Sequence, residues 1–135
     1  MNNQEKKQYL LRCRNLNYKI NALLREKERL QDFVCKVTPS LSGMPRGNSG
    51  GREDSLARLA DINSDINRSI DRYVQTRKEI AACLDRLEDG RLYELMRLRY
   101  LAGETWEQVA EDMGIDTRWA TRLHGKALSI LEIDP

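Results

Sequence analysis

Six side chains between positions 117 and 126 have the types and spacing needed to bind DNA from one face of a helix. Arginine makes paired hydrogen bonds to guanine edges, and threonine contacts phosphates or the methyl group of thymine. We therefore expect Arg118, Thr121 and Arg122 to contact base edges. The candidate DNA-binding residues are Thr117, Arg118, Trp119, Thr121, Arg122 and Lys126.

The other three members of this set have different expected roles. Thr117 and Lys126 are expected to contact phosphates, which fix the register of a protein on a duplex. Trp119 leaves two interpretations open, because an indole in an outward position either contacts DNA or packs against a neighbouring helix.

The charge around these residues is unfavourable for DNA. Residues 91–135 hold six Lys or Arg and eight Asp or Glu, whereas residues 1–37 hold nine and four. Phosphate binding depends on positive charge. Either the first segment helps to hold DNA, or a dimer doubles a weak contact, or the contact is with a protein. The carboxylates nearest to the candidate helix are Glu104, Glu107, Glu111 and Asp112.

Residues 105–131 are expected to form two helices joined by a tight turn. Thr105 and Gln108 form a capping box that starts one helix, and Asp116 is a cap residue for the next. A helix-turn-helix needs small or apolar residues at five places around its turn. Those places hold Ala110, Gly114, Ile115, Ala120 and Leu123.

A third helix is expected just before these two, over about residues 92–102. Its apolar spacing is helical, and Gly103 suits a left-handed C-terminal cap. The residues that set this spacing are Leu92, Leu95, Met96, Arg99 and Tyr100. The inward residues expected on the later helices are Trp106, Val109, Ala110, Met113, Ala120, Leu123, Ala127, Leu128 and Leu131.

Two long helices are expected upstream, over residues 3–37 and 53–88, because apolar residues recur there at alternating spacings of three and four. Asp54 and Ser55 are cap residues for the second helix. The first seam is Tyr9, Cys13, Leu16, Ile20, Leu23, Lys27, Leu30, Val34 and Val37. The second is Leu56, Leu59, Asn63, Ile66, Ile70, Tyr73, Arg77, Ile80, Leu84 and Leu87.

Residues 38–52 contain two Pro and four Gly, so we expect a loop that joins the two helices into an antiparallel hairpin. If residues that face each other across the hairpin have numbers that sum to about 90, Ile20 lies opposite Ile70 and Lys27 opposite Asn63. Some apolar residues lie beside the seams, where a pair of helices cannot bury them. A homodimer formed through the hairpin would bury these residues. They are Leu10, Leu24, Phe33, Ile62 and Val74.

The composition narrows the function classes. Charged residues make up 33% of the chain and aromatic residues 6%, which is typical of long solvated helices. Cys13, Cys35 and Cys83 are odd in number and far apart, so we expect free thiols in a reducing compartment. We find neither a secretory signal pattern nor an apolar run that would span a membrane, and we expect a cytoplasmic protein.

Catalytic and metal chemistry find little support in the residues. His124 is the one histidine and has no partner at ligand spacing, which predicts a polar helix position rather than a metal site. The glycines of the expected loop do not form a phosphate-binding motif, and the carboxylates are scattered over solvated helix faces. We therefore expect no enzyme, no cofactor and no metal.

The segment from Leu95 to Leu131 resembles region four of bacterial sigma factors, which is a helix-turn-helix. The sequence departs from that pattern at three places. Gln108 stands where Glu is usual, Asp116 where Ser is usual, and Ala120 where Val is usual, which weakens a core contact. The matching residues are Arg99, Tyr100, Gly103, Thr105, Val109, Ala110, Met113, Gly114, Ile115, Arg122, Lys126, Ala127, Leu128 and Leu131.

Nearly the whole chain is similar to the ArpU- and RinA-like family of late-gene transcriptional activators, found in phages and prophages of Gram-positive bacteria. The most specific parts are Met44-Pro45-Arg46-Gly47 and the segment 99–103. The resemblance implies binding to double-stranded DNA near a phage promoter, in the cytoplasm of a bacterial host, and points to host RNA polymerase as a partner.

The sequence therefore predicts an all-α protein, with a helical hairpin over residues 1–88 and a three-helix DNA-binding domain over residues 89–135. Two alternatives stay open. A small terminase, the DNA-packaging subunit, also combines a helix-turn-helix with a hairpin, but usually places the helix-turn-helix first and forms rings. A protein-interaction module would use the same fold without binding DNA.

Overall fold

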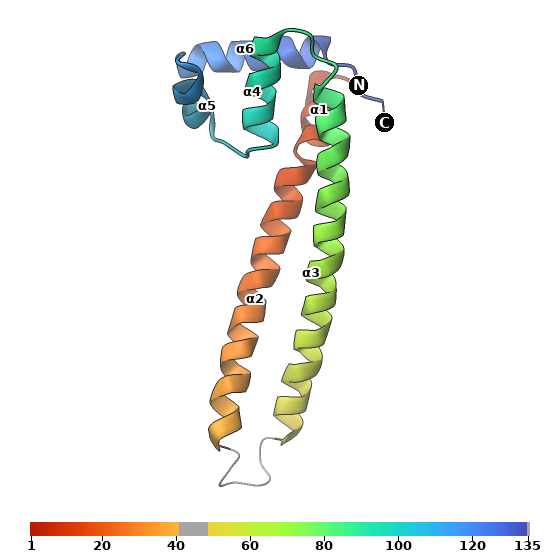
Figure 1. Ribbon diagram of the computed structural model, residues 1–135, viewed down its shortest axis with the longest axis vertical. Coiled ribbons are helices and arrows are strands. Elements are labelled where there is room, and N and C mark those ends of the chain that lie inside the picture. Colours follow the sequence, from red (N-terminus) through yellow and green to blue (C-terminus); the bar gives the residue numbers. More distant parts are fainter. Residues whose placement is uncertain (41–48, 135) are drawn as a thin grey trace. The chain divides into compact units, whose positions relative to one another are not determined.

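The computed structural model describes the backbone of residues 1–40 and 49–134, and the side chains of 1–36 and 51–134. All regular structure in these ranges is helical, which confirms the expected all-α class (Figure 1). No helix in the described ranges has the length and apolar character needed to span a membrane. The helices are α1 (Asn3–Leu10), α2 (Arg12–Ser40), α3 (Ser49–Leu84), α4 (Gly90–Tyr100), α5 (Trp106–Met113) and α6 (Thr117–Ile130).

The chain forms two compact units, which do not follow the expected division between residues 88 and 89. The terminal unit combines residues 1–16 with 73–135, and the middle unit is residues 17–72. The reason is that both ends of the long helical region contribute to the C-terminal core. Leu10, Ile80 and Leu84, for example, have no exposed surface and belong to the same cluster as Leu95.

The first helix is interrupted at Leu11, although we expected one continuous helix over residues 3–37. The segment has no Gly or Pro at this point, so the cause is tertiary. The break brings Leu10, which lies off the heptad seam, into the core with no exposed surface. Arg12 stabilises the break, because its Nε donates to the carbonyl of Tyr9 (3.1 Å) and its guanidinium lies 4.1 Å from the centre of that ring.

The second long helix begins and ends earlier than we expected. Helix α3 starts at Ser49, so Asp54 and Ser55 are not its caps, and it ends at Leu84 rather than near residue 88. Ser55 lies inside the helix, where its hydroxyl donates to the carbonyl of Gly51 (2.9 Å). The expected loop 38–52 is shorter at both ends, and its centre, including Met44 to Gly47, lies outside the described residues.

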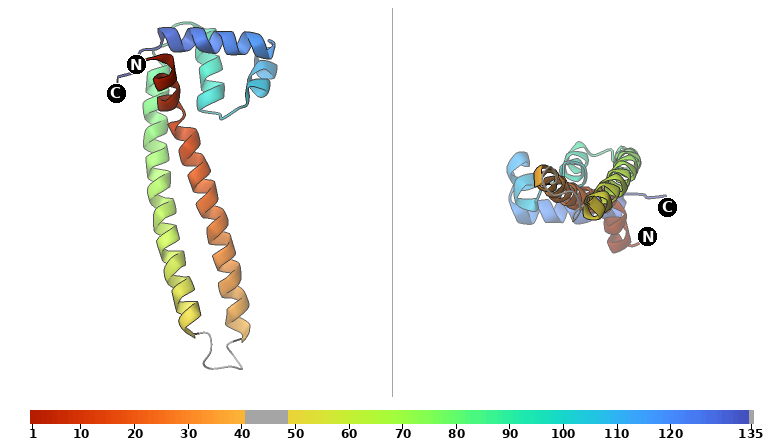
Figure 2. Two further views of the ribbon diagram at one scale, coloured as in Figure 1. Left: turned by 180° about the vertical axis from the view of Figure 1, so that it is seen from behind. Right: turned by 90° about the horizontal axis from the view of Figure 1, so that it is seen from below.

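In the middle unit, α2 and α3 lie side by side and run in opposite directions, as Figure 1 and the left view of Figure 2 show. The seam expected on α2 is its least exposed side in both units: Leu16, Ile20, Leu23, Lys27, Leu30 and Val34 are half-buried. In the terminal unit, Arg12 of α2 lies 3.0 Å from Glu79 of α3, close to the expected register.

The buried face of α3 is rotated relative to the seam that we expected. Positions 59, 66, 73, 80, 84 and 87 are on it as expected, but Leu56 and Ile70 are 43% and 41% exposed. The expected pairing of Ile20 with Ile70 is therefore wrong. The residues one position before Leu56, Asn63, Ile70 and Arg77 are buried, and they are Ser55, Ile62, Ser69 and Thr76. Cys83 is buried together with Leu84, its neighbour in the expected seam.

The rotation follows from side-chain size and hydrogen bonding. Ser and Thr hydroxyls can bond to a carbonyl of their own helix, as Ser55 does, which lowers the cost of burying such a side chain. Their small size also suits a helix that packs closely against another. A prediction based on apolar residues alone places Ser and Thr on the exposed side of a helix. The sequence therefore indicated the face of α3 that contains Leu56 and Ile70.

The two isoleucines Ile62 and Ile70 give a direct test of this rotation. Ile62 is 7% exposed and Ile70 is 41% exposed. We expect Ile62→Ala to lower the free energy of unfolding by about 2–4 kcal/mol, because a buried Ile is replaced by a cavity. Ile70→Ala should cost less than about 1 kcal/mol. Urea unfolding in dilute solution measures both, and equal costs would contradict the rotated face.

The terminal unit has one continuous apolar core. Helix α6 contacts α1, α4 and α5, and α4 also contacts α5. Every inward residue that we expected on α4, α5 and α6 is buried or half-buried. Cys13 and Cys83 are buried free thiols, and burial raises the pKa of both, whereas Cys35 in the middle unit is exposed.

Candidate nucleic-acid interface

The ends of α5 and α6 are fixed by the side chains that the sequence indicated. Thr105 accepts from the amide of Gln108 (3.2 Å), and the Gln108 side chain accepts from the amide of Thr105 (2.9 Å), which confirms the capping box. Asp116 accepts from the amide of Trp119 (2.8 Å) and caps α6. The orientation of α6 is thus set by its first turn.

The turn between α5 and α6 depends on Gly114. This residue has φ +68° and ψ 33°, a left-handed conformation that favours glycine. The next amide, of Ile115, donates to the carbonyl of Ala110 (3.0 Å) and closes the end of α5. Ala110 and Ala120 are almost fully buried, so these small side chains let the two helices pack closely.

All six candidate DNA-binding side chains are exposed on α6. Arg118, Arg122 and Lys126 are four residues apart, so they lie along one side of the helix. Ala120 and Ala127, which have no exposed surface, mark the opposite side. The structure therefore brings the three cations into one line that points away from the core.

Trp119 is 40% exposed and lies at an outward position of α6. Ile130, near the end of the same helix, is 53% exposed. The inward tryptophan is Trp106 of α5, whose ring lies 4.6 Å from that of His124 and 4.7 Å from the Arg99 guanidinium. The indole of Trp119 is exposed and available to a partner, whereas Trp106 packs against the core beside His124.

Two glycines near this surface give a matched pair of predictions. At both Gly125 and Gly114 an added Cβ would meet nothing within 4 Å. Gly125 lies inside α6, so Gly125→Ala should stabilise the protein by about 0.5–1 kcal/mol. Gly114 has a positive φ, so Gly114→Ala should destabilise it by about 1 kcal/mol. Thermal unfolding measures both, and shifts of the same sign would contradict the helical conformation of Gly125 or the left-handed conformation of Gly114.

His124 is buried, which corrects the polar helix position that we expected. It is 8% exposed, and its Nε2 lies 2.6 Å from the hydroxyl of Tyr100, with which it shares a hydrogen bond. Burial, together with the charges of Lys7 and Arg99, lowers the pKa of His124 to about 4. Burial raises the pKa of Tyr100 to about 12. At neutral pH both groups are therefore uncharged.

Helix α1 lies against α6, a contact that the sequence did not reveal. The Nζ of Lys6 donates to the carbonyl of Leu128 (2.7 Å), in the last turn of α6, where carbonyls lack helical partners. Lys7 is close enough for its charge to lower the pKa of His124. The one feature of the sequence that could have indicated this contact is Leu10, an apolar residue outside the heptad seam.

Four carboxylates lie on α5 or just before it, and they are Glu104, Glu107, Glu111 and Asp112. A side-chain hydrogen bond with Asp112 raises the pKa of Glu104, so these two carboxyl groups lie together. Glu107 and Glu111 are exposed on α5. None of these four carboxylates is therefore on α6.

We compared the chain with protein-family models, with curated proteins and with solved structures, and none matched. The resemblance to sigma region four and to phage regulators therefore rests on the residues quoted above. Further support for a function has to come from the geometry of the terminal unit.

Proposed function

We propose that this protein is a sequence-specific DNA-binding regulator of phage or prophage transcription, with α4 to α6 acting as a helix-turn-helix similar to sigma region four. The observation that carries the proposal is the line of exposed Arg118, Arg122 and Lys126 on a helix capped by Asp116. A capped helix with cations on its outer face is the arrangement that DNA-reading helices use in the major groove.

The position of α1 supports this proposal, because it addresses the unfavourable charge. Residues 73–135 alone hold nine Lys or Arg and twelve Asp or Glu. Residues 1–16, which belong to the same unit, add four basic residues and one acidic residue. The terminal unit is therefore neutral rather than negative, and Lys6 and Lys7 lie next to α6.

The experiment that tests the proposal measures binding of the full chain to fragments of the genome around its own gene, at two salt concentrations. We expect tight binding to one fragment and much weaker binding to the rest. If about four phosphates are contacted, affinity should fall roughly 100-fold between about 50 and 200 mM salt. Weak and uniform binding, or none, would overturn the proposal.

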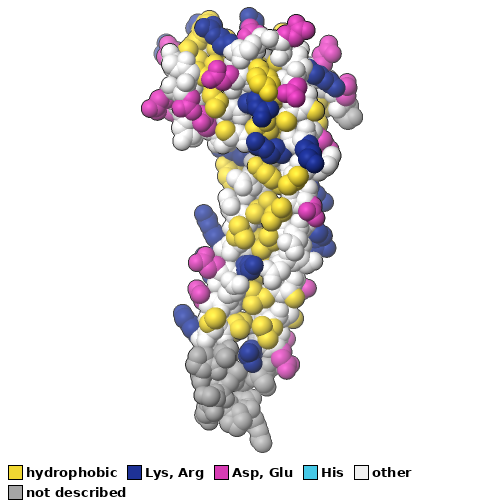
Figure 3. Space-filling view, in the orientation of Figure 1, with side chains coloured by type: hydrophobic (Ala, Val, Ile, Leu, Met, Phe, Trp, Pro, Cys, Tyr) yellow, Lys and Arg dark blue, Asp and Glu magenta, His cyan; other side chains and the backbone are white. Residues whose placement is uncertain are grey.

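We also propose that the protein is a homodimer through α2 and α3. Leu24 and Phe33 on α2 and Leu56 and Ile70 on α3 are each more than 40% exposed, which is unusual for large apolar residues on neighbouring helices. Figure 3 shows hydrophobic side chains in a band along this region. Val74, another residue expected beside the seam, is also exposed, whereas Leu10 and Ile62 are buried.

Replacing apolar residues of this band should separate the dimer. We expect the wild-type chain to sediment at twice its 15.7 kDa mass at tens of micromolar. Leu56→Gln with Ile70→Gln should sediment as a monomer, because the substitutions replace exposed apolar area that a second copy would cover. The exposed Arg58→Gln on the same helix is the control. A strictly monomeric wild-type chain would contradict the proposal.

A protein-interaction module is the second candidate function, and the exposed Trp119 and Ile130 favour it. Tryptophan is among the residues that contribute most at protein interfaces. Under this alternative, Trp119→Ala abolishes binding to a protein such as host RNA polymerase, and no DNA fragment is preferred. If DNA is read instead, the wild-type chain prefers one fragment, and Trp119→Ala changes its affinity for that fragment only where the indole contacts DNA.

A further inference from the structure

A second basic site lies in the middle unit and contains none of the candidate DNA-binding residues of α6. It is a groove of about 330 Å³ between α2 and α3. All of its lining residues are of polar type, and three of them are cations. The lining residues are Lys19, Asp65, Arg68, Ser69 and Arg72.

The groove is lined by three cations but only one carboxylate, so its lining has a net positive charge. Arg68 donates to Asp65, so the one lining carboxylate is matched by one of the three cations. Lys19 and Arg72 then add two positive charges to the same concave space. Arg68 and Arg72 are also four residues apart on α3, where like charges destabilise a helix. A bound anion would relieve this repulsion, and a concave wall strengthens its attraction.

The donors suit one class of ligand. Guanidinium groups bind phosphate oxygens in pairs, and an ammonium group adds a point charge. Ser69, which is 5% exposed, also lines the groove, and a serine hydroxyl can donate to a phosphate oxygen. We propose that this groove binds a phosphate-type oxyanion. Two sources offer that chemistry, namely a phosphodiester of a nucleic acid and free inorganic phosphate.

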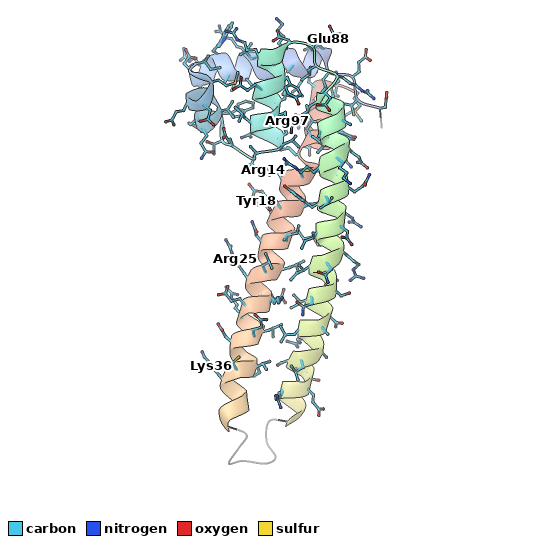
Figure 4. The ribbon with its side chains drawn as sticks, viewed as in Figure 1. Arg14, Tyr18, Arg25, Lys36, Glu88 and Arg97 are labelled. Atoms are coloured by element: carbon cyan, nitrogen blue, oxygen red, sulfur yellow. The ribbon has the colours of Figure 1, made fainter. Side chains whose placement is uncertain are left out.

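The first arm of the test titrates the full chain with inorganic phosphate at constant ionic strength and follows its amide resonances. We expect saturable shifts centred on residues 19, 68, 69 and 72. Lys19→Gln with Arg72→Gln should weaken this binding at least fivefold, and Lys19→Arg with Arg72→Lys should restore it. The matched control is Lys36→Gln with Arg58→Gln, which removes the same charge elsewhere; Figure 4 shows Lys36 pointing away from α3.

The second arm measures affinity for a duplex of arbitrary sequence with the same variants. If the groove holds a phosphodiester, the Lys19/Arg72 variant weakens duplex binding at least fivefold, and the control does not. If free phosphate is the ligand, phosphate binding is lost and duplex binding is unchanged. Both results support the site. Unsaturable phosphate shifts together with equal duplex binding by variant and control would overturn it, whatever α6 does with DNA.

Discussion

Replacing Arg118 and Arg122 together with alanine is expected to weaken binding to the preferred DNA fragment by at least about thirtyfold. Each paired contact of an arginine with a guanine contributes about 1–3 kcal/mol of discrimination, so losing two removes about 2 kcal/mol or more. Both side chains are exposed on α6, so their loss should leave the fold intact. Affinity for unrelated fragments should fall much less, because base contacts and not phosphates are lost.

The control for this variant removes the same charge from other exposed positions. Arg58→Ala with Arg91→Ala suits this purpose, since neither residue is on α6. We expect the control to change affinity for all fragments slightly and equally. Fluorescence anisotropy with the preferred and an unrelated fragment measures both effects. If the Arg118/Arg122 variant stays within twofold of the wild type on the preferred fragment, α6 does not read base edges.

The second large expected effect is a loss of stability in mild acid, caused by His124. Its pKa is about 4 in the folded protein and about 6.5 in the unfolded chain. At pH 7 both states hold a neutral imidazole. As pH falls below about 6.5, the unfolded chain takes up a proton that the folded protein rejects, so stability falls until about pH 4. The difference of about 2.5 units corresponds to about 3 kcal/mol.

This prediction can be checked cleanly because His124 is the one histidine of the chain. Its imidazole Cε1 proton gives one resonance, whose midpoint in the folded protein should lie near pH 4. Urea unfolding at several pH values gives the matching loss of stability. His124→Gln, which does not titrate in this range, should show about 3 kcal/mol less loss than the wild type between pH 7 and pH 4. A folded-state midpoint above pH 6 would contradict the buried imidazole.

The local features of the C-terminal helices were predictable because they depend on neighbouring residues. The capping box of Thr105 and Gln108, the cap at Asp116 and the left-handed Gly114 all act within four or five positions. The inward faces followed from helical spacing. The exposure of Arg118 and Arg122 then follows, because a residue opposite a buried face has to point outward.

Features that depend on distant parts of the chain were not predictable in this way. The break at Leu11 arises because the core of α4 to α6 accepts Leu10. The buried face of α3 includes Ser69, whose polarity indicated the opposite orientation. His124 was expected at a polar helix position because the residue that shares its hydrogen bond, Tyr100, is 24 positions away in the sequence. In each case tertiary packing overrides the local preference.

The core of the terminal unit draws on both ends of the chain, and this has a consequence for biosynthesis. Leu10 and Cys13 are synthesised more than 100 residues before Leu128 and Leu131, which belong to the cluster that buries them. On the ribosome, α1 therefore has to wait without its partner until α6 emerges. This unit cannot complete its core before α6 has been synthesised, and a nascent chain that stalls before residue 120 exposes the apolar side of α1 to chaperones.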